Sequence, residues 1–347
     1  MSSFVALMMS GGVDSSTSAR ILQDQGYSLI GVHFLLPGKD NTLQESGWKK
    51  VQAVCDDLKI PCQLLDVQSI FEQSVIRYFV DSYKEGFTPN PCVMCNKTIK
   101  FGMFFDYAIQ ELKADFIASG HYARIKSYRD RLYIQEAFDK TKDQSYFLFT
   151  LSQRVLEKVL FPLGELTKKQ VMQYAKQHHF IQETYQESED LCFVAGHYVE
   201  YLSSHLPHQS GNIVDLQGKI LGEHTGVHQF TIGQRQGLQI SHPEPLYVLA
   251  LRPQQNEVIV GRKVDCFSKK LIIHPIYNIQ EVSKTKKRRC TGRVRYRSEK
   301  KPCSVTIHEN SAEVLFDEPI FAVTPGQMLV LYKDDRVMGG GVIQSGA

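Results

Sequence analysis

A glycine- and serine-rich segment near the N-terminus could bind an anion. The string Ser10-Gly11-Gly12-Val13-Asp14-Ser15-Ser16 follows an apolar run, residues 4–9, that is typical of a buried strand, and precedes a helical pattern over 17–25. Glycines let backbone N–H groups approach phosphate oxygens closely, and the dipole of the following helix favours negative charge. Three hydroxyl groups can add donors, those of Ser10, Ser15 and Ser16. The pattern therefore predicts a phosphate-binding loop between a strand and a helix.

The loop has neither the Gly-Lys-Ser/Thr ending of a Walker A motif nor the Gly-x-Gly-x-x-Gly fingerprint of dinucleotide sites. It resembles the pyrophosphate-binding loop of enzymes that split ATP into AMP and pyrophosphate. An ordinary strand-to-helix turn without a ligand is the plain alternative, and the complete string makes it the weaker one. Asp14 would repel phosphates unless it holds a Mg²⁺ that they also contact or caps the helix. We favour the role linked to Mg²⁺.

A second chemical signal is the pair Cys92 and Cys95 in the segment 88–97, which reads Thr-Pro-Asn-Pro-Cys-Val-Met-Cys-Asn-Lys. Its prolines favour an extended entry, so the segment is expected to be a loop before a helix that starts near residue 99. Lys97 and Lys100 follow closely. A cysteine near a helix N-terminus and beside lysines is expected to have a lowered pKa and to be reactive.

Several interpretations of the cysteines compete. A structural zinc site needs four ligands, and the sequence has only one Cys-x-x-Cys pair. A buried structural pair fits poorly with the polar, proline-rich surroundings. A catalytic pair is better supported, in which one cysteine carries a persulfide sulfur and another attacks it. The serious alternative is a [4Fe-4S] cluster with an open iron position, held by Cys92, Cys95 and Cys192. The other cysteines are expected to be core thiols.

Length and composition limit the class of protein. A chain of 347 residues predicts two or three domains. The hydrophobic share of 42% and the charged share of 22% are normal for a soluble globular protein. No apolar run approaches the ~20 residues that a membrane span needs. Without a leader-like N-terminus, the eight cysteines indicate a reducing compartment, so we expect a cytoplasmic protein. A monomer is the default expectation.

Strand and helix patterns alternate over residues 1–205, which predicts an α/β domain with a doubly wound parallel sheet. The expected strands are 4–9, 29–35, 63–67 and 116–119, and the expected helices are 15–25, 47–58, 70–85, 99–112 and 168–178. Ligands of such folds lie at the carboxyl ends of the strands. The Ser10–Ser16 loop falls at such a strand end.

Helical periodicity fades after residue 205. A small central module is expected over 206–268, with a hairpin formed by 211–215 and 218–222. A β barrel is expected over 269–347, with strands at 271–274, 289–297, 304–308, 312–316, 327–332 and 337–343. The chain would thus end in an all-β domain.

A basic run crosses the expected barrel at 284–301, where ten residues are basic and one is acidic. If the strand 289–297 is continuous, three guanidinium groups share one of its faces, those of Arg293, Arg295 and Arg297. Such a face suits a nucleic-acid backbone. The alternative is a sheet edge kept basic to prevent aggregation.

Taken together, the motifs are specific. The chain resembles the tRNA-specific 2-thiouridylases over nearly its whole length. The matching segments, in chain order, are 10–15, 88–97, 118–122, 142–146, 191–193, 231–237, 293–297, 324–327 and 339–341. The resemblance implies an N-terminal domain of the PP-loop ATP pyrophosphatase type, which is like the adenine nucleotide alpha-hydrolases.

The activity that this resemblance implies is sulfur transfer to the wobble uridine, position 34, of tRNA. ATP, used with Mg²⁺, adenylates O2 of the base. A persulfide on Cys192 supplies sulfur, and Cys95 is the partner nucleophile that either releases sulfide or leaves a transient Cys95–Cys192 disulfide. The implied partners are tRNAs for Lys, Glu and Gln and a sulfur-carrier protein or cysteine desulfurase as donor. The same thiolation with an iron–sulfur cluster is the alternative, and an amide-forming ATP pyrophosphatase is a remote one.

The resemblance also assigns residues by position. It implies ATP contacts at Met8, Met9, Ser10, Gly11, Gly12, Val13, Asp14, Ser15, Phe34 and Gly120. It implies target-base contacts at Asn90, Pro91 and Cys92, and tRNA contacts at His121, Lys142, Asp143, Gln144, Arg295, Tyr296 and Gln327. Many members carry Asp where this chain has Cys92, and a thiol does not supply that fixed charge.

Overall fold

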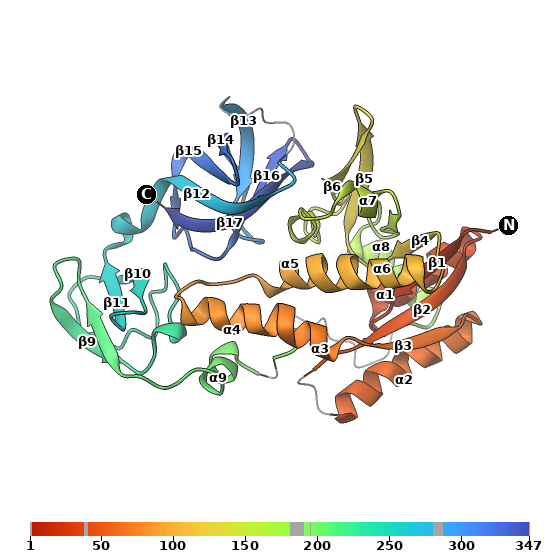
Figure 1. The fold of residues 1–347 in the computed structure, drawn as a ribbon, viewed down its shortest axis with the longest axis horizontal. Helices are drawn as coiled ribbons and strands as arrows, with labels where there is room; N and C mark the ends of the chain where they lie inside the picture. Colours follow the sequence, from red (N-terminus) through yellow and green to blue (C-terminus); the bar gives the residue numbers. More distant parts are fainter. Residues whose placement is uncertain (1, 38–40, 181–190, 195, 280–286, 347) are drawn as a thin grey trace. The chain divides into compact units, whose positions relative to one another are not determined.

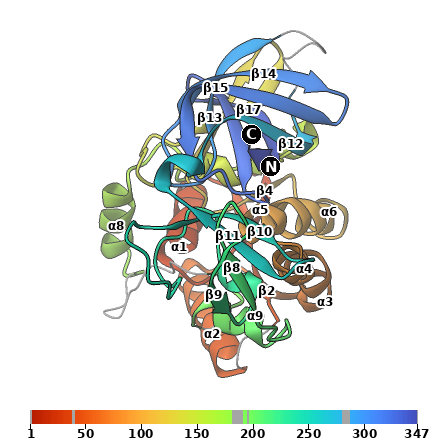
Figure 2. The ribbon, with the colours of Figure 1, turned by 90° about the vertical axis from the view of Figure 1, so that its left-hand side faces the viewer.

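A computed structural model describes residues 2–37, 41–180, 191–194, 196–279 and 287–346 (Figures 1 and 2). The chain divides into two compact units. The first unit comprises Met1–Val75, Cys92–Phe193 and Asp335–Val337. The second unit comprises Ile76–Pro91, Val194–Asp334 and Met338–Ala347. Each unit is described by itself.

The first unit contains a parallel sheet with the strand order β3-β2-β1-β4-β7. Its strands are β1 (Phe4–Met8), β2 (Ser28–Leu35), β3 (Cys62–Asp66), β4 (Phe116–Ala118) and β7 (Val159–Leu160). Both β2 and β4 pair with β1 in parallel. The predicted parallel sheet is therefore confirmed. The order reverses beside β1, and the crevice at such a reversal is the usual ligand site of open α/β sheets.

Helices cover both faces of this sheet. Apolar side chains of α1 (Val13–Asp24) and α2 (Asn41–Leu58) share one core with Val5, Leu7 and Met9. On the opposite face, Phe34 of β2 meets Phe104 of α6 (Phe104–Gln110) with ring centroids 5.3 Å apart. Helix α8 (Lys168–Gln177) lies beside α1 (Figures 1 and 2). The doubly wound arrangement is confirmed.

The cysteine segment differs from its prediction. Instead of a loop before residue 99, the chain forms α5 (Pro91–Cys95), a π-helical segment Asn96–Met103 and then α6. Pro91 is the first helical residue, a position at which a proline loses no helical hydrogen bond. The predicted extended entry is found at residues 88–90, but the prediction of a loop from Pro91 to the start of the helix was wrong. A second π-helical segment, Glu72–Ile76, lies between α3 (Gln68–Phe71) and α4 (Arg77–Lys84) within the predicted 70–85 helix.

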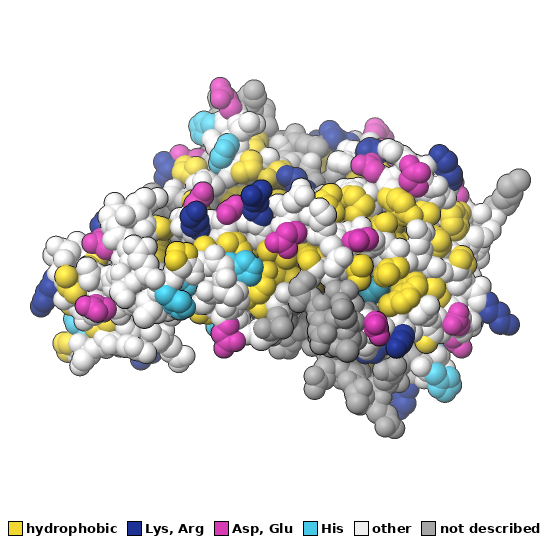
Figure 3. Space-filling model, turned by 60° about the horizontal axis from the view of Figure 1, so that its bottom comes forward, with side chains coloured by type: hydrophobic (Ala, Val, Ile, Leu, Met, Phe, Trp, Pro, Cys, Tyr) yellow, Lys and Arg dark blue, Asp and Glu magenta, His cyan; other side chains and the backbone are white. Residues whose placement is uncertain are grey.

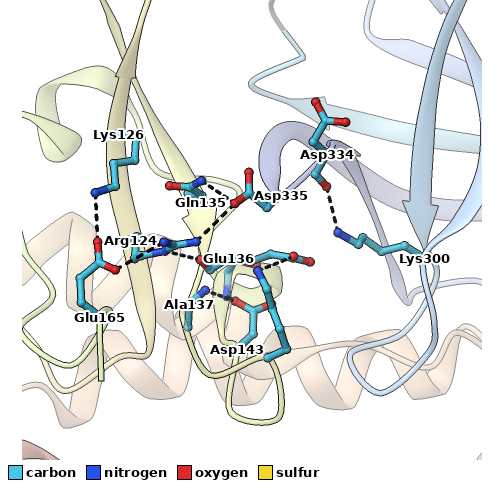
Figure 4. A network of polar contacts seen from close by, with 12 residues as sticks. Arg124, Lys126, Gln135, Glu136, Ala137, Asp143, Glu165, Lys300, Asp334 and Asp335 are labelled. Carbon is cyan, nitrogen blue, oxygen red and sulfur yellow. Dashed lines mark hydrogen bonds and ion pairs between the residues drawn. The ribbon is translucent and has the colours of Figure 1, made fainter. Parts of the chain in front are cut away.

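A hairpin of β5 (Ala123–Tyr128) and β6 (Arg131–Glu136) belongs to the first unit but was not predicted. Arg124 organises its base, as Figure 4 shows. The guanidinium donates to the Glu136 carbonyl over 2.7 Å and forms ion pairs with Glu165 and Asp335 at 3.4 and 3.3 Å. Shorter helical turns follow at Ser145–Phe147 and at α7 (Gln153–Leu156).

The second unit contains α9 (Tyr198–Ser203) and a small sheet with the order β10-β11-β8-β9. The strands are β8 (Gly211–Val214), β9 (Ile220–His224), β10 (Tyr247–Arg252) and β11 (Glu257–Gly261). β8 and β9 pair antiparallel, which confirms the predicted hairpin. Ile213, Val248, Val258 and Val260 are fully buried in the core of this module.

The same unit contains a closed barrel of six described strands in the order β12-β15-β14-β13-β16-β17, which pairing of β12 with β17 closes. The strands are β12 (Phe267–Tyr277), β13 (Arg288–Arg293), β14 (Lys301–His308), β15 (Ser311–Phe321), β16 (Met328–Lys333) and β17 (Arg336–Gly346). The predicted barrel is confirmed. Within it, Cys290 and Cys303 face each other across β13 and β14, with sulfur atoms 3.6 Å apart.

The predicted basic strand face is wrong. β13 ends at Arg293, and the chain then bends and turns through residues 294–297. Val294 is still buried in the barrel core, but the strand pairing has ended before it. Arg295 and Arg297 therefore do not continue the face that carries Arg293. Residues 284–286 of the basic run lie outside the described residues.

Among the described helices, none combines the length and the apolar character that a membrane crossing requires. Figure 3 shows one face of the molecule, on which basic and acidic side chains are interspersed. This face carries no extended field of one sign in its described part. Any strongly basic surface for a nucleic acid would have to lie elsewhere.

Candidate active site

The glycine loop connects β1 to α1 in the first unit, at the carboxyl edge of the sheet. Its hydroxyl groups fold the loop onto itself. The Ser15 and Ser16 hydroxyls donate to the Gly12 carbonyl over 3.0 and 3.1 Å, and the Ser10 amide donates to the Ser15 hydroxyl over 3.3 Å. The chain therefore presents a compact turn at the N-terminus of a helix, where backbone N–H groups attract anions.

Glycine is required at two positions of the site, because other parts of the chain lie too close to leave room for a side chain. Gly11 has φ +76°, and a Cβ built there would lie 2.9 Å from the Cβ of Lys50 on α2. Gly120 follows β4, and its Cβ would lie 3.1 Å from backbone atoms of Asp14 and Ser15. The turns that follow β1 and β4 thus touch at the place where the strand order reverses. Side chains there would separate them.

Asp14 is engaged by two groups that the sequence did not single out. Its carboxylate accepts from the Tyr122 hydroxyl over 2.8 Å and from Lys168 Nζ over 2.8 and 3.0 Å. The helix N-cap is Gly12, so the alternative in which Asp14 caps the helix does not hold. Among the residues that the structure describes, no group of three or more His, Cys, Asp or Glu side chains could hold a metal ion.

The remaining nucleotide contacts that the resemblance implies surround the loop. Met8, Met9 and Val13 are buried under it. The carbonyl of Met9 lies 2.7 Å from His33 Nδ1, which fixes the exit of β1. Phe34, near the end of β2, is half-buried against Phe104. These side chains form an apolar base beneath the turn.

Three cysteines gather in the first unit. Cys92 is exposed and Cys95 half-buried on α5, while the distant Cys192 is exposed. The next residue, Phe193, is buried and packs edge-on against Phe71, with ring centroids 5.7 Å apart. Cys192 lies close enough to raise the pKa of both Cys92 and Cys95. The fold thus brings together thiols that are about a hundred positions apart in the sequence.

The expected lowering of the thiol pKa is not found. Removal from water raises the pKa of Cys95 to about 12 and also raises that of Cys92. The charge of Lys100 lowers both values but does not outweigh this desolvation. The expectation from helix position and neighbouring lysines was therefore wrong, because it ignored burial. Cys95 is a protonated thiol in the resting protein.

His121 lies between the two parts of the site. Its Nδ1 atom is 2.8 Å from the Ser119 hydroxyl, and its ring packs near Phe101 and Phe161. Burial and the charge of Lys100 hold the pKa of His121 well below its usual value, so the ring is neutral at pH 7. Lys100 thus acts on His121 and on the thiols. Within residues 119–122, Gly120 thus contacts the glycine loop, and His121 is affected by the same lysine as the thiols.

Comparison with known proteins supplies the family. Three family models match consecutive parts of the chain, described as a tRNA methyl transferase HUP domain (residues 3–196), a tRNA methyl transferase PRC-barrel domain (199–262) and an aminomethyltransferase beta-barrel domain (268–343). A tRNA-specific 2-thiouridylase MnmA of Synechocystis is 42% identical over 99% of this chain and 97% of that protein. The chain belongs to the tRNA-specific 2-thiouridylase family.

A second curated relative agrees with this family. The MnmA protein of Trichormus variabilis is 42% identical over 98% of each chain. Among solved structures, the U34-tRNA thiolase NcsA of Methanococcus maripaludis, with its [4Fe-4S] cluster, is 17% identical. It covers 58% of this chain and 64% of its own, with a TM-score of 0.37.

The segment 142–144, for which the resemblance implies tRNA contacts, has partners within the protein. Asp143 is buried and accepts from the Ala137 amide and from the amide and hydroxyl of Ser145, over 2.9 to 3.2 Å. Desolvation nevertheless raises its pKa. Gln144 Oε1 accepts from the Tyr122 amide over 2.9 Å. Lys142 is half-buried in the same turn. Gln144 therefore braces the segment 119–122, whereas Asp143 holds Ala137 and Ser145.

The resemblance also implies tRNA contacts in the second unit, and one of these residues, Arg295, is hydrogen-bonded within the protein. Arg295 Nη2 donates to the Ala322 carbonyl and the Thr324 hydroxyl over 2.5 Å, and to the Ile232 carbonyl over 3.5 Å. Tyr296 is half-buried in the turn after it. Gln327 lies before β16. Asn90 and Pro91 also belong to the second unit, whereas the three cysteines belong to the first.

An iron–sulfur cluster is not supported by this arrangement. A cluster with three cysteine ligands needs side chains that converge on one point. Among the described residues, which include Cys92, Cys95 and Cys192, no group of three or more His, Cys, Asp or Glu side chains is placed to hold a metal ion. The three cysteines as placed do not fit a cluster, and no step is derived through one.

Sequence reasoning missed two residues of the site, Lys168 and Tyr122, which hold Asp14. Lys100 was singled out beside the cysteines, but its effect on His121 was not expected. The Thr167–Gln170 capping box signals the start of α8 and so places Lys168 at a helix N-terminus. No sequence signal, however, shows that this helix lies beside α1.

Proposed function

We propose that the protein catalyses ATP-dependent 2-thiolation of the wobble uridine, position 34, in tRNA. The observation that carries the proposal is the 42% identity to a tRNA-specific 2-thiouridylase across 99% of the chain. Two observations support it: Gly120 contacts the phosphate-type loop, and Lys100 acts on both His121 and the thiols, which fits adjacent sites for activation and sulfur transfer. ATP would bind at the Ser10–Ser16 loop.

In the first step, O2 of the uridine attacks the α-phosphorus of ATP, and pyrophosphate leaves. The base becomes adenylated, so a poor leaving group is converted into AMP. The N-terminus of α1 and Lys168 can stabilise the negative charge that develops on pyrophosphate. Asp14 keeps Lys168 next to the loop before the nucleotide arrives.

In the second step, the terminal sulfur of a Cys192 persulfide attacks C2 of the base, and AMP leaves. The Cys95 thiolate then attacks Cys192 Sγ, which breaks the sulfur–sulfur bond to the base. The products are 2-thiouridine and a Cys95–Cys192 disulfide, so two thiol electrons have reduced the transferred sulfur. A dithiol reductant restores both thiols, and a persulfide donor reloads Cys192.

The test is thiolation of an unmodified tRNA transcript, for Lys, Glu or Gln, with MgATP and a persulfide donor. We expect 2-thiouridine, AMP and pyrophosphate in equal amounts by mass spectrometry and nucleotide analysis. Cys192→Ser and Cys95→Ser should each lose thiolation, whereas Cys62→Ser, outside the cluster, should not. Absence of 2-thiouridine with the wild-type protein would overturn the proposal.

An anaerobic iron and sulfide assay on the same preparation separates the two sulfur chemistries. We expect full activity without stoichiometric iron. Loss of both activity and a brown chromophore in Cys92→Ala would instead establish the cluster mechanism. The donor, a sulfur-carrier protein or a cysteine desulfurase, is identified by which one transfers labelled sulfur to Cys192.

A further inference from the structure

Within the second unit, the segment before the cysteine helix is held by a turn of the barrel. Gln327 Nε2 donates to the carbonyls of Thr88 and Pro89 over 3.0 and 3.3 Å. The Thr88 amide in turn donates to the Pro325 carbonyl over 2.9 Å. Residues about 240 positions apart therefore share three hydrogen bonds. Both amide hydrogens of Gln327 are used in this contact.

The barrel turn lies so close to Thr88 that residue 326 must be a glycine. Gly326 has φ +89°, in the left-handed region that favours glycine. A Cβ built there would lie 2.8 Å from the Thr88 nitrogen and 2.9 Å from the Thr88 oxygen. Any side chain at residue 326 would therefore push the segment away from the barrel.

The turn is itself firmly anchored. The amide of Gly326 donates to the Ile343 carbonyl, and the amide of Ile343 donates to the Gln327 carbonyl, both over 2.8 Å. The Thr324 hydroxyl accepts from Arg295, so the arginine holds the start of the turn. Strand β17 and Arg295 thus make the turn a rigid support.

The segment is also held by α4. The Tyr78 hydroxyl is hydrogen-bonded by the backbone of Asn90, which lowers the pKa of Tyr78, although desolvation raises that pKa to about 12 overall. Residues 88, 89 and 90 therefore each have a partner from α4 or from the barrel turn. Of the proposed target-base contacts, Asn90 therefore belongs to this held segment, and Pro91 follows it directly.

We infer that Gln327 and Gly326 are positioning residues, which act on the target base through the backbone of residues 88–91. The inference rests on the proposed function, because it assigns Asn90 and Pro91 to the base. It changes the role expected for Gln327 from family position, a direct tRNA contact. The barrel turn sets the place of the base loop, and catalysis depends on that place.

The first experiment measures kinetics and tRNA binding of Gln327→Glu and Gly326→Ala. Gln327→Glu keeps the side-chain size but sets an acceptor against two carbonyls. We expect kcat for thiolation to fall about 10- to 100-fold in both variants, with the Kd for tRNA within about twofold of wild type, because displacement of a reacting group costs rate. A raised Kd with unchanged kcat would establish direct tRNA contact and overturn the inference.

The matched control is Gln344→Ala. Gln344 also lies in the barrel and donates its side-chain amide to a backbone carbonyl, that of His274. It should leave kcat and Kd unchanged. Equal loss in Gln344→Ala and Gln327→Glu would assign the effect to general barrel damage and contradict a positioning role.

A second measurement does not depend on activity. Hydrogen exchange of the amide of Thr88, which donates to Pro325, should accelerate in Gln327→Glu and Gly326→Ala but not in Gln344→Ala. Unchanged exchange would contradict the proposal that the barrel turn holds residues 88–91, even if the enzyme is active. If the wild-type protein makes no 2-thiouridine, the proposed function fails, and exchange alone still decides whether the barrel turn holds the segment.

Discussion

Reactivity of Cys95 must be created during the reaction. Burial raises the pKa of this thiol to about 12, and the charge of Cys192 raises it further, while Lys100 acts in the opposite direction. Under the proposed mechanism, a protonated Cys95 would not attack a persulfide on Cys192 before the base is present. The high pKa would therefore protect the loaded enzyme from premature loss of sulfur.

This protection predicts the pH profile of alkylation. With a pKa of about 12, only about one Cys95 in ten thousand is a thiolate at pH 8. The iodoacetamide rate at Cys95, followed by peptide mass spectrometry, should rise about tenfold per pH unit from pH 7 to 9.5 without levelling. An alkylation rate that levels off near pH 8.5 would show that Cys95 has the pKa of an ordinary thiol.

Lys100 provides the matched variant for this measurement. Replacement by Met removes a cation that lowers the pKa of Cys95 and Cys92. Alkylation of Cys95 at pH 8 should therefore slow further. Lys97→Met, one turn earlier in the same helical segment, should leave the rate unchanged.

At the scale of elements, the site depends on the contact between two turns. The turn after β4 touches the turn after β1 because Gly120 has no side chain. Gly120→Ala should therefore weaken ATP binding by more than about tenfold, since its Cβ would displace the backbone of Asp14 and Ser15. Isothermal titration with a non-hydrolysable ATP analogue measures this effect.

Gly47→Ala is the control for that variant. It lies on α2 near the same loop, but its Cβ would be 3.5 Å from the His33 ring, an ordinary contact. ATP affinity should be retained. Normal affinity in Gly120→Ala would show that the two turns tolerate separation.

The pairing of α8 with α1 gives a second prediction. Lys168 is the first residue of α8 and holds Asp14, so its removal leaves an unneutralised carboxylate where phosphates bind. Lys168→Met should raise the Kd for ATP about tenfold or more, the loss of one charge-assisted contact. Lys168→Arg should recover part of the affinity.

Lys176→Met, an exposed position near the other end of α8, serves as control and should bind ATP normally. Thermal unfolding of each variant separates the two roles of the ion pair. Unchanged ATP affinity with a lowered Tm in Lys168→Met would make the lysine a structural residue alone.

The same scale shows how far sequence reasoning reaches. The buried run of β1, the glycine turn and the barrel strands were predictable because alternation and turn residues are local signals. The β5–β6 hairpin was missed because its turn residues, Arg129 and Asp130, adopt φ +49° and +58° without a glycine. Pro91 suggested a loop but begins a helix.

At the scale of the whole molecule, the family resemblance located residues but not their partners. Asp143 and Arg295 were expected at the tRNA, yet their polar atoms hold backbone groups of the protein itself. Partners of this kind come from segments far apart in the chain, such as Ile232 and Thr324 around Arg295. No spacing in a single sequence encodes these contacts.

This distinction can be measured through the salt dependence of tRNA binding. A side chain that neutralises a phosphate contributes to the slope of log Kd against log salt, whereas one that holds the fold does not. Arg295→Gln should therefore lower the free energy of unfolding by about 2 to 4 kcal/mol, since it removes charge-assisted hydrogen bonds to three acceptors. Its salt slope should equal that of the wild type.

Arg297, two residues later, is exposed and tests the opposite case. Arg297→Gln should leave unfolding unchanged and reduce the salt slope by about one unit, if the turn after β13 meets the RNA backbone. A reduced slope in Arg295→Gln with normal stability would return Arg295 to the tRNA surface. Unchanged slopes in both variants would move the phosphate contacts away from this turn, and the basic residues of the run would then serve the barrel alone.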